Sequence, residues 1–155
     1  MPTAYQTDFY AWTQDQARQL REAAAARVNL PLDFENLAEE VESMGRSDAR
    51  AVNSALTRIL EHLLKLEYSP AAGPRDGWEE SVNVQRLNLR DVLADSPSLH
   101  GRIDLERCWR DGRRLAARGL NQDGIAPGAL PVACPYTLDQ AFDESWWPAN
   151  RHGLA

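Results

Sequence analysis

The feature that most constrains the fold is an apolar segment with helical spacing in the middle of the chain. Its apolar side chains recur every three or four positions: Val52, Ala55, Leu56, Ile59, Leu60, Leu63, Leu64 and Leu66. The face they form is too wide for a surface helix, and a helix of this kind is buried in a core. We therefore expect a central helix that starts at Ser47 and stops at Ser69-Pro70, with Leu60 and Leu63 fully buried.

The other periodic segments also repeat every three or four residues. They predict helices over about 7–27, 33–44, 78–95 and 98–118, and a short helix that begins at the capping-box pattern Thr137-Leu-Asp-Gln140. Thr7, Asp33 and Ser98 are the expected N-caps, and Gly45 and Gly119 the expected stops. No segment alternates apolar and polar residues as a strand does. The fold class we predict is all-α, an irregular helical bundle of five main helices plus a short C-terminal helix.

The length and composition favour one domain. The chain has 155 residues, of which 43% are hydrophobic and 26% charged, as in a soluble globular domain with a single core. A chain of this size needs neither a disulfide nor a structural metal for stability. We expect a single helical domain over residues 1–155, with a Gly/Pro-rich coil at about 119–136 before the last helix.

The charge and the termini exclude several classes of protein. Seventeen basic residues against 23 acidic ones give a net charge of -6, the wrong sign for a dedicated nucleic-acid-binding protein. The N-terminus lacks the features of a signal peptide, and no apolar stretch approaches the length of a membrane span. Cys108 and Cys134 fit no metal or redox motif. We expect a cytoplasmic, acidic protein, bacterial by its arginine-rich composition, that binds neither nucleic acid nor a membrane.

Three carboxylates share one edge of the predicted 33–44 helix. Glu35, Glu39 and Glu42 follow at i, i+4 and i+7, whereas Glu40 falls on the opposite flank. Oxygen ligands of this kind suit Mg²⁺ or Mn²⁺, so these glutamates are the candidate metal ligands. The alternative is a solvated acidic edge that pairs with nearby arginines, for which the candidates are Arg46, Arg50 and Arg58.

Candidate catalytic residues are few. His62 lies on the flank of the apolar helix and is either a ligand, a general base or a boundary histidine bonded to a backbone carbonyl. A hairpin turning at Gly45 would leave it far from Glu39. Arg86 lies on a flank of the 78–95 helix and could pair with the glutamates or with the carboxylate or phosphate of a ligand. Glu39, His62 and Arg86 are the three candidates, and no cofactor is predicted.

The predicted 98–118 helix has an arginine-rich face. Arg107, Arg110, Arg114 and Arg118 lie on one side of it. In a basic protein such a stripe would indicate phosphate binding. In an acidic protein it is more often a solvated face.

Seven short sequence blocks, taken in order, resemble a bacterial family called domain of unknown function 29. They are Tyr5-x-x-Asp8-Phe9-x-x-Trp12, the segment from Leu32 to Arg46, His62-Leu63-Leu64-Lys65-x-x-Tyr68, Trp78 with Gln85-Arg86, Asp95-Ser96-Pro97-Ser98-Leu99, Cys134-Pro135-Tyr136-Thr137 and Trp147-Pro148. The resemblance spans nearly the whole chain. It implies a small all-helical protein and no established activity.

The motifs of common enzymes are missing from the sequence. It contains no GxSxG, P-loop, GxGxxG or HExxH pattern. Because the sequence builds a core thoroughly and a catalytic site not at all, the leading hypothesis is a non-enzymatic helical interaction module that self-associates or binds a protein partner. The alternative is a small metal-dependent hydrolase or nucleotide-processing enzyme that uses the glutamates of the 33–44 helix.

Overall fold

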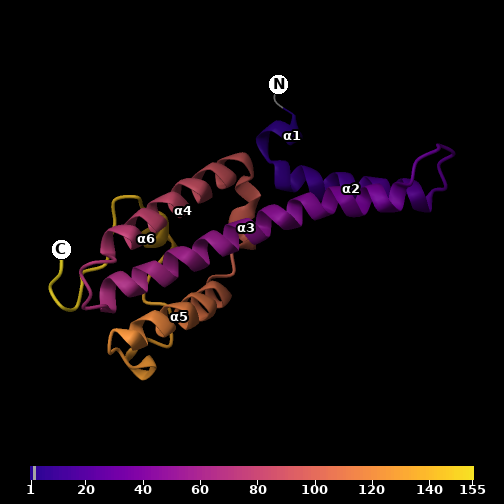
Figure 1. The fold of residues 1–155 in the computed structure, drawn as a ribbon. Coiled ribbons are helices and arrows are strands. Elements are labelled where there is room, and N and C mark those ends of the chain that lie inside the picture. Colours follow the sequence, from indigo (N-terminus) through magenta and orange to yellow (C-terminus); the bar gives the residue numbers. More distant parts are fainter. Residues whose placement is uncertain (2) are drawn as a thin grey trace. The chain divides into compact units, whose positions relative to one another are not determined.

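The computed structural model describes residues 1 and 3–155, and all its regular elements are helices (Figure 1). In chain order they are α1 (Ala4–Thr7), α2 (Phe9–Ala25), α3 (Phe34–Tyr68), α4 (Arg75–Asp95), the 3₁₀ helix η1 (Pro97–Arg102), α5 (Leu105–Gln122), the 3₁₀ helix η2 (Pro127–Ala129) and α6 (Leu138–Phe142). Within the described residues there is no strand, which confirms the all-α class. In that same part of the chain, no helix is both long enough and apolar enough to cross a membrane.

The largest departure from the sequence prediction is α3, which is a single helix of 35 residues. The predicted stop at Gly45 and the predicted start at Ser47 are both wrong. Gly45 is a packing residue, because a Cβ atom there would lie 2.3 Å from Thr13 Oγ1 and 3.2 Å from Tyr10 Cδ2 of α2. The glycine therefore lets α2 approach the first half of α3, alongside which it runs (Figure 1).

Two predicted N-caps are also wrong, and aspartates replace them. The Asp8 carboxylate caps α2 and the Asp104 carboxylate caps α5, each by accepting a hydrogen bond from a backbone N–H of the first turn. Thr7 belongs to the separate short helix α1, and Ser98 lies within η1. Asp33 does cap α3 as predicted, since its Oδ1 accepts from the amide of Asn36 at 3.2 Å.

The remaining helix ends agree more closely with the sequence. α3 ends directly before Ser69-Pro70, and α6 begins with the predicted capping box, in which Thr137 Oγ1 accepts from the amide of Gln140 at 3.1 Å. α5, in contrast, continues past Gly119 to Gln122. The irregular segment before α6 therefore starts a few residues later than predicted.

The contacts divide the chain into two compact units. Unit 1 is Met1–Val52 with Asp91–Ile103, and unit 2 is Asn53–Arg90 with Asp104–Ala155. The apolar core predicted from the sequence lies mainly in unit 2, where Leu60 and Leu63 are 0% exposed, as expected. There α5 packs on α3 at Gly112, whose Cβ would lie 2.9 Å from the Thr57 carbonyl oxygen. The single domain over 1–155 stays a prediction.

Candidate functional site

The predicted glutamate edge exists, but arginines pair with two of its three glutamates. Glu42 accepts a hydrogen bond from Arg21 Nη2 at 2.6 Å and lies 3.3 Å from Arg46 Nη1, and Glu39 also pairs with Arg46. The hydrogen bond from Arg21 lowers the pKa of Glu42. Arg46 was among the expected partners, whereas Arg21 comes from α2 and was not foreseen. Glu35 belongs to the same edge and, like the others, joins no group of three or more potential metal ligands in the described part of the chain.

His62 occupies the boundary position that was one of its predicted alternatives. Its Nδ1 lies 2.9 Å from the carbonyl oxygen of Arg58, one turn earlier in α3. Burial lowers the pKa of His62. The hairpin that would have placed Glu39 and His62 on neighbouring helices does not exist, because α3 is continuous. Glu39 belongs to unit 1 and His62 to unit 2.

Arg86 is only 2% exposed and binds the C-terminal segment of unit 2. Its Nε donates to the carbonyl oxygen of Ala141 at 2.9 Å, and its Nη2 donates to the carbonyl oxygens of Gln140 and Trp146 at 3.1 and 2.9 Å. The guanidinium also lies 4.8 Å from the centre of the Trp147 ring. Each of the three candidate catalytic residues is thus engaged by its own neighbours.

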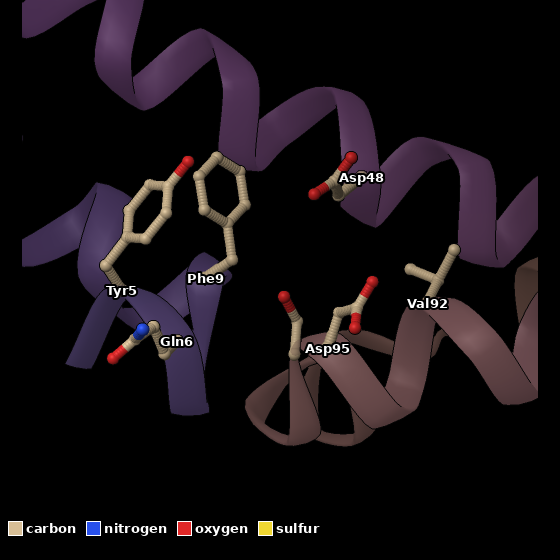
Figure 2. Close-up of a pocket in the computed structure, with 7 residues that line it drawn as sticks. Tyr5, Gln6, Phe9, Asp48, Val92 and Asp95 are labelled. Carbon is tan, nitrogen blue, oxygen red and sulfur yellow. The ribbon is translucent and has the colours of Figure 1, made fainter. Parts of the chain in front are cut away.

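A different group of residues forms a pocket of about 310 Å³ in unit 1. It is lined by Tyr5, Gln6, Phe9, Asp48, Val92, Asp95 and Ser96. Figure 2 shows the carboxylates of Asp48, on α3, and Asp95, at the end of α4, on two sides of the same space. The rings of Tyr5 and Phe9 lie at a third side. The pocket therefore combines two acidic groups with an aromatic wall.

The aromatic wall follows from helical spacing near the N-terminus. Tyr5, Phe9 and Trp12 are three or four residues apart, and their rings contact one another with centres 4.9 to 5.7 Å apart. Tyr5 and Trp12 meet edge to face, and Phe9 and Trp12 are stacked. Such aromatic pairs stabilise packing beyond the area they bury. They hold the Phe9 and Tyr5 rings in place at the pocket.

The opposite wall is tied to α2 by side-chain hydrogen bonds. Asp8 accepts from both the amide and the hydroxyl of Ser98, each at 2.8 Å, and the buried Ser96 hydroxyl accepts from the amide of Tyr10 at 3.0 Å. Ser96 directly follows Asp95 and separates α4 from η1, and Ser98 is the second residue of η1. These bonds join the start of α2 to this segment and so position Asp95 beside the aromatic wall.

The two aspartates of the pocket lack a counter-charge. Neither Asp48 nor Asp95 forms a hydrogen bond or an ion pair with another residue that the structure describes. Burial, and to a smaller extent the charge of Asp95, raises the pKa of Asp48. Two neighbouring carboxylates destabilise each other in their ionised form. A cation bound between them would remove this repulsion.

A second pocket, of about 380 Å³, shares two residues with the first. Phe9 and Asp48 line both, and the other residues of the second pocket come from α3: Glu40, Ser43, Met44 and Ser47. Met44 is 50% exposed, and Glu40 has no ion-pair partner among the residues described. We call the two pockets together the acidic groove.

Sequence reasoning did not select Asp48, Asp95 or Glu40. Two sequence blocks that carry the family resemblance, Asp95 to Ser98 and Tyr5 to Trp12, contain residues of the pocket. Glu40 had been placed on the flank opposite the glutamate edge. What the sequence could not supply was the pairing of segments about 90 residues apart, such as Asp8 with Ser98.

Comparison with known proteins gives the chain a family. The family described as "Domain of unknown function DUF29" matches residues 4–147. The chain belongs to this family. The match confirms the resemblance seen in the sequence, and it includes every residue of the acidic groove. As a DUF29 protein, the chain shares its helical fold with an α-helical protein of unknown function from Rhodospirillum rubrum.

The similarity to that crystal structure extends over both chains. The two sequences are 32% identical, the alignment covers 94% of this chain and 93% of the other, and the TM-score is 0.81. A comparison with curated proteins gave no match.

Proposed function

We propose that this DUF29 protein is a non-enzymatic helical interaction module that holds a cationic side chain of a protein partner in the acidic groove. The observation that carries the proposal is the pair of uncompensated carboxylates, Asp48 and Asp95, in a pocket with an aromatic wall. Unit 1 as a whole favours a cation, because it contains eleven acidic residues and only six basic ones.

The chemistry of the pocket suits a guanidinium or ammonium group better than a metal ion. Carboxylates accept charge-assisted hydrogen bonds from arginine or lysine, and the faces of Tyr5 and Phe9 attract organic cations. Calcium and magnesium take about six or more oxygen ligands, of which a two-carboxylate pocket supplies a minority. A planar guanidinium can satisfy the carboxylates and contact the rings at once, so arginine is the preferred side chain.

The metal-dependent hydrolase remains the weaker hypothesis. It would use Glu35, Glu39 and Glu42, and a metal ion at that edge would have to displace Arg21 and Arg46 from their glutamate partners. We favour the interaction module because its acidic groups need no such displacement. We further propose that the protein acts in a bacterial cytoplasm and binds neither nucleic acid nor a membrane, which its free thiols and net charge of -6 support.

The test is a titration with N-acetyl-arginine amide, which carries one guanidinium and no other charge. We expect millimolar binding, about -4 kcal/mol, seen as NMR shift changes for residues that line the pocket. The citrulline analogue is the neutral isostere and should bind at least tenfold more weakly.

Matched variants locate the site of binding. Asp95→Asn should weaken the binding of the arginine derivative at least fivefold. Glu35 is an exposed acid on α3 outside the groove, so Glu35→Gln should leave the affinity unchanged. Equal binding of the citrulline analogue, or equal binding by Asp95→Asn and wild type, would show that the pocket does not recognise a cation.

A further inference from the structure

We propose that the partner of the acidic groove is a second copy of this chain, which inserts the arginine face of its α5. This inference rests on the proposed function and names the partner. Both halves of the contact lie on every copy, the groove in unit 1 and the arginine face in unit 2.

The arginine face consists of four exposed residues of α5, which we call the arginine stripe: Arg107, Arg110, Arg114 and Arg118. Arg114 lies 3.8 Å from Asp111, an exposed pair of the kind that contributes little. The other three arginines form no ion pair with any residue in the described part of the chain. The stripe thus presents positive charge that the protein does not use internally.

The groove presents the complementary charge. Glu40, Asp48 and Asp95 line it, and none of them forms an ion pair within residues 1 and 3–155. Elsewhere in unit 1, arginines cover the carboxylates of Glu39 and Glu42. The groove thus brings together three acids without an ion pair, opposite in sign to the stripe.

The spacing of the two surfaces also matches. Glu40 and Asp48 are eight residues apart on α3, and Arg110 and Arg118 are eight residues apart on α5. Eight residues of helix span about 12 Å, and positions seven or eight apart lie on the same face. Two helices packed side by side can therefore place both arginines opposite both acids.

The middle of the contact is apolar on the groove side. Met44 lies midway between Glu40 and Asp48, and the Phe9 ring borders both pockets. Arg114 lies midway between Arg110 and Arg118 on α5, so it would face Met44 and the Phe9 ring. An arginine can cover apolar surface with its aliphatic stem and bind an aromatic face with its guanidinium. Three of the four positions of the stripe, Arg110, Arg114 and Arg118, thus have a fitting counterpart in the groove.

The geometry of such a contact is head to tail. Because the groove and the stripe are different surfaces, a copy that donates its stripe still has its own groove free. Self-association would therefore continue into rings or chains with rising protein concentration. Since the contact is largely ionic, it should weaken as salt screens the charges, over a Debye length of about 10 Å at 0.1 M salt.

The experiment is sedimentation of full-length protein at about 50 mM salt, with two triple variants. The groove variant is Glu40→Gln/Asp48→Asn/Asp95→Asn, and the stripe variant is Arg110→Gln/Arg114→Gln/Arg118→Gln. We expect the wild type to pass from monomer to larger species between about 10 μM and 1 mM. Each variant alone should stay monomeric, and circular dichroism should show that each remains folded.

The mixture of the two variants gives the decisive result. Each variant keeps the surface that the other lacks, so together they can form one interface and should yield dimers but no larger species. Exposed control variants outside both surfaces, Glu35→Gln and Arg50→Gln, should associate like the wild type. A wild type that stays monomeric at about 1 mM, or variants that do not complement each other, would overturn the inference.

The outcome is separable from that of the proposed function. A monomeric wild type that still binds N-acetyl-arginine amide at the pocket would mean that the groove serves a different protein. A wild type that neither self-associates nor binds the arginine derivative would reject both proposals.

Discussion

The two units of the molecule treat their charged groups differently. In unit 2 the buried acid Glu61 and the half-buried acid Glu67 have internal partners. Glu61 accepts hydrogen bonds from Lys65 at 2.8 Å and Arg58 at 2.9 Å, and Glu67 accepts from Tyr136 and Arg151. Eleven basic residues nearly balance twelve acidic ones there. These pairs stabilise the unit, and the charge that it offers to a partner lies on the exposed arginine stripe of α5.

Unit 1 lacks this balance. Its groove contains Asp48 and Asp95 in one pocket (Figure 2), and unpaired Glu40 lies eight residues before Asp48 on α3. Unpaired like charges repel each other and lower the stability of the free protein. A cation that binds only the folded protein raises its free energy of unfolding, and the gain grows with the ratio of cation concentration to Kd. The comparison assigns the apolar core to unit 2 and the cation-binding groove to unit 1, and each prediction below tests one side of it.

The largest expected effect is in the core of unit 2. Leu63→Ala should reduce the free energy of unfolding by about 2–5 kcal/mol, because a fully buried leucine leaves a cavity when it is truncated. Leu37→Ala in unit 1 is the control. Leu37 is 40% exposed, and its loss should cost less than about 0.5 kcal/mol. Reversible urea denaturation measures both, and a cost below about 1 kcal/mol for Leu63→Ala would contradict the assignment.

The next effect tests the packing of α2 on α3 in unit 1. Gly45→Ala should destabilise by about 1–3 kcal/mol, since its Cβ would lie 2.3 Å from Thr13 Oγ1 and the buried threonine has little room to move. Gly77→Ala in α4 is the matched control, because nothing lies within 4 Å of its Cβ. It should stabilise by up to about 1 kcal/mol through helix propensity. If both variants stabilise, Gly45 is not a packing residue.

The smallest effect concerns the charges of the groove. The pKa of Asp48 is raised above 3.8 in the folded protein, so its ionised form costs stability at neutral pH, and this cost disappears as the pH falls through the folded pKa toward 3.8. Asp48→Asn should therefore be more stable than wild type at pH 7 by a few tenths of a kcal/mol, with the difference vanishing near pH 4.

Glu42→Gln should change the free energy of unfolding at pH 7 in the opposite direction. The pKa of Glu42 is lowered below 4.5 by Arg21, so its charge stabilises the fold at neutral pH, and this contribution is lost as the pH falls through the folded pKa. The variant should be less stable than wild type at pH 7. Urea denaturation across the pH range follows both variants, and the same sign for both would contradict the contrast between paired and unpaired acids.

The elements of the fold that depend on local pattern could be predicted from the sequence. The apolar face from Val52 to Leu66 predicted a buried helix, and Thr137 to Gln140 predicted a capped one. Gly45 misled the prediction because a glycine that ends a helix and a glycine that admits a neighbouring helix look the same in sequence. Only the contact with Thr13 distinguishes the two roles.

The candidate site was less predictable for a related physical reason. A carboxylate becomes a binding group through what surrounds it, and sequence does not show which acids lack a partner. Glu39 and Glu42 form the more conspicuous pattern, yet Arg21 and Arg46 neutralise them. Asp48 and Asp95 form no joint pattern in the sequence, because they come from different helices and meet only in the folded unit.

The most direct test of the account is the pKa of the Asp48 carboxyl group, measured by NMR without and with N-acetyl-arginine amide. Without ligand, the pKa should lie above the ordinary value of 3.8, because of burial and the charge of Asp95. With ligand at about ten times its Kd, the pKa should fall by about one pH unit, since the cation binds the ionised pocket in preference to the protonated one. A pKa that does not change at this ligand concentration would contradict the claim that unit 1 binds a cation between Asp48 and Asp95.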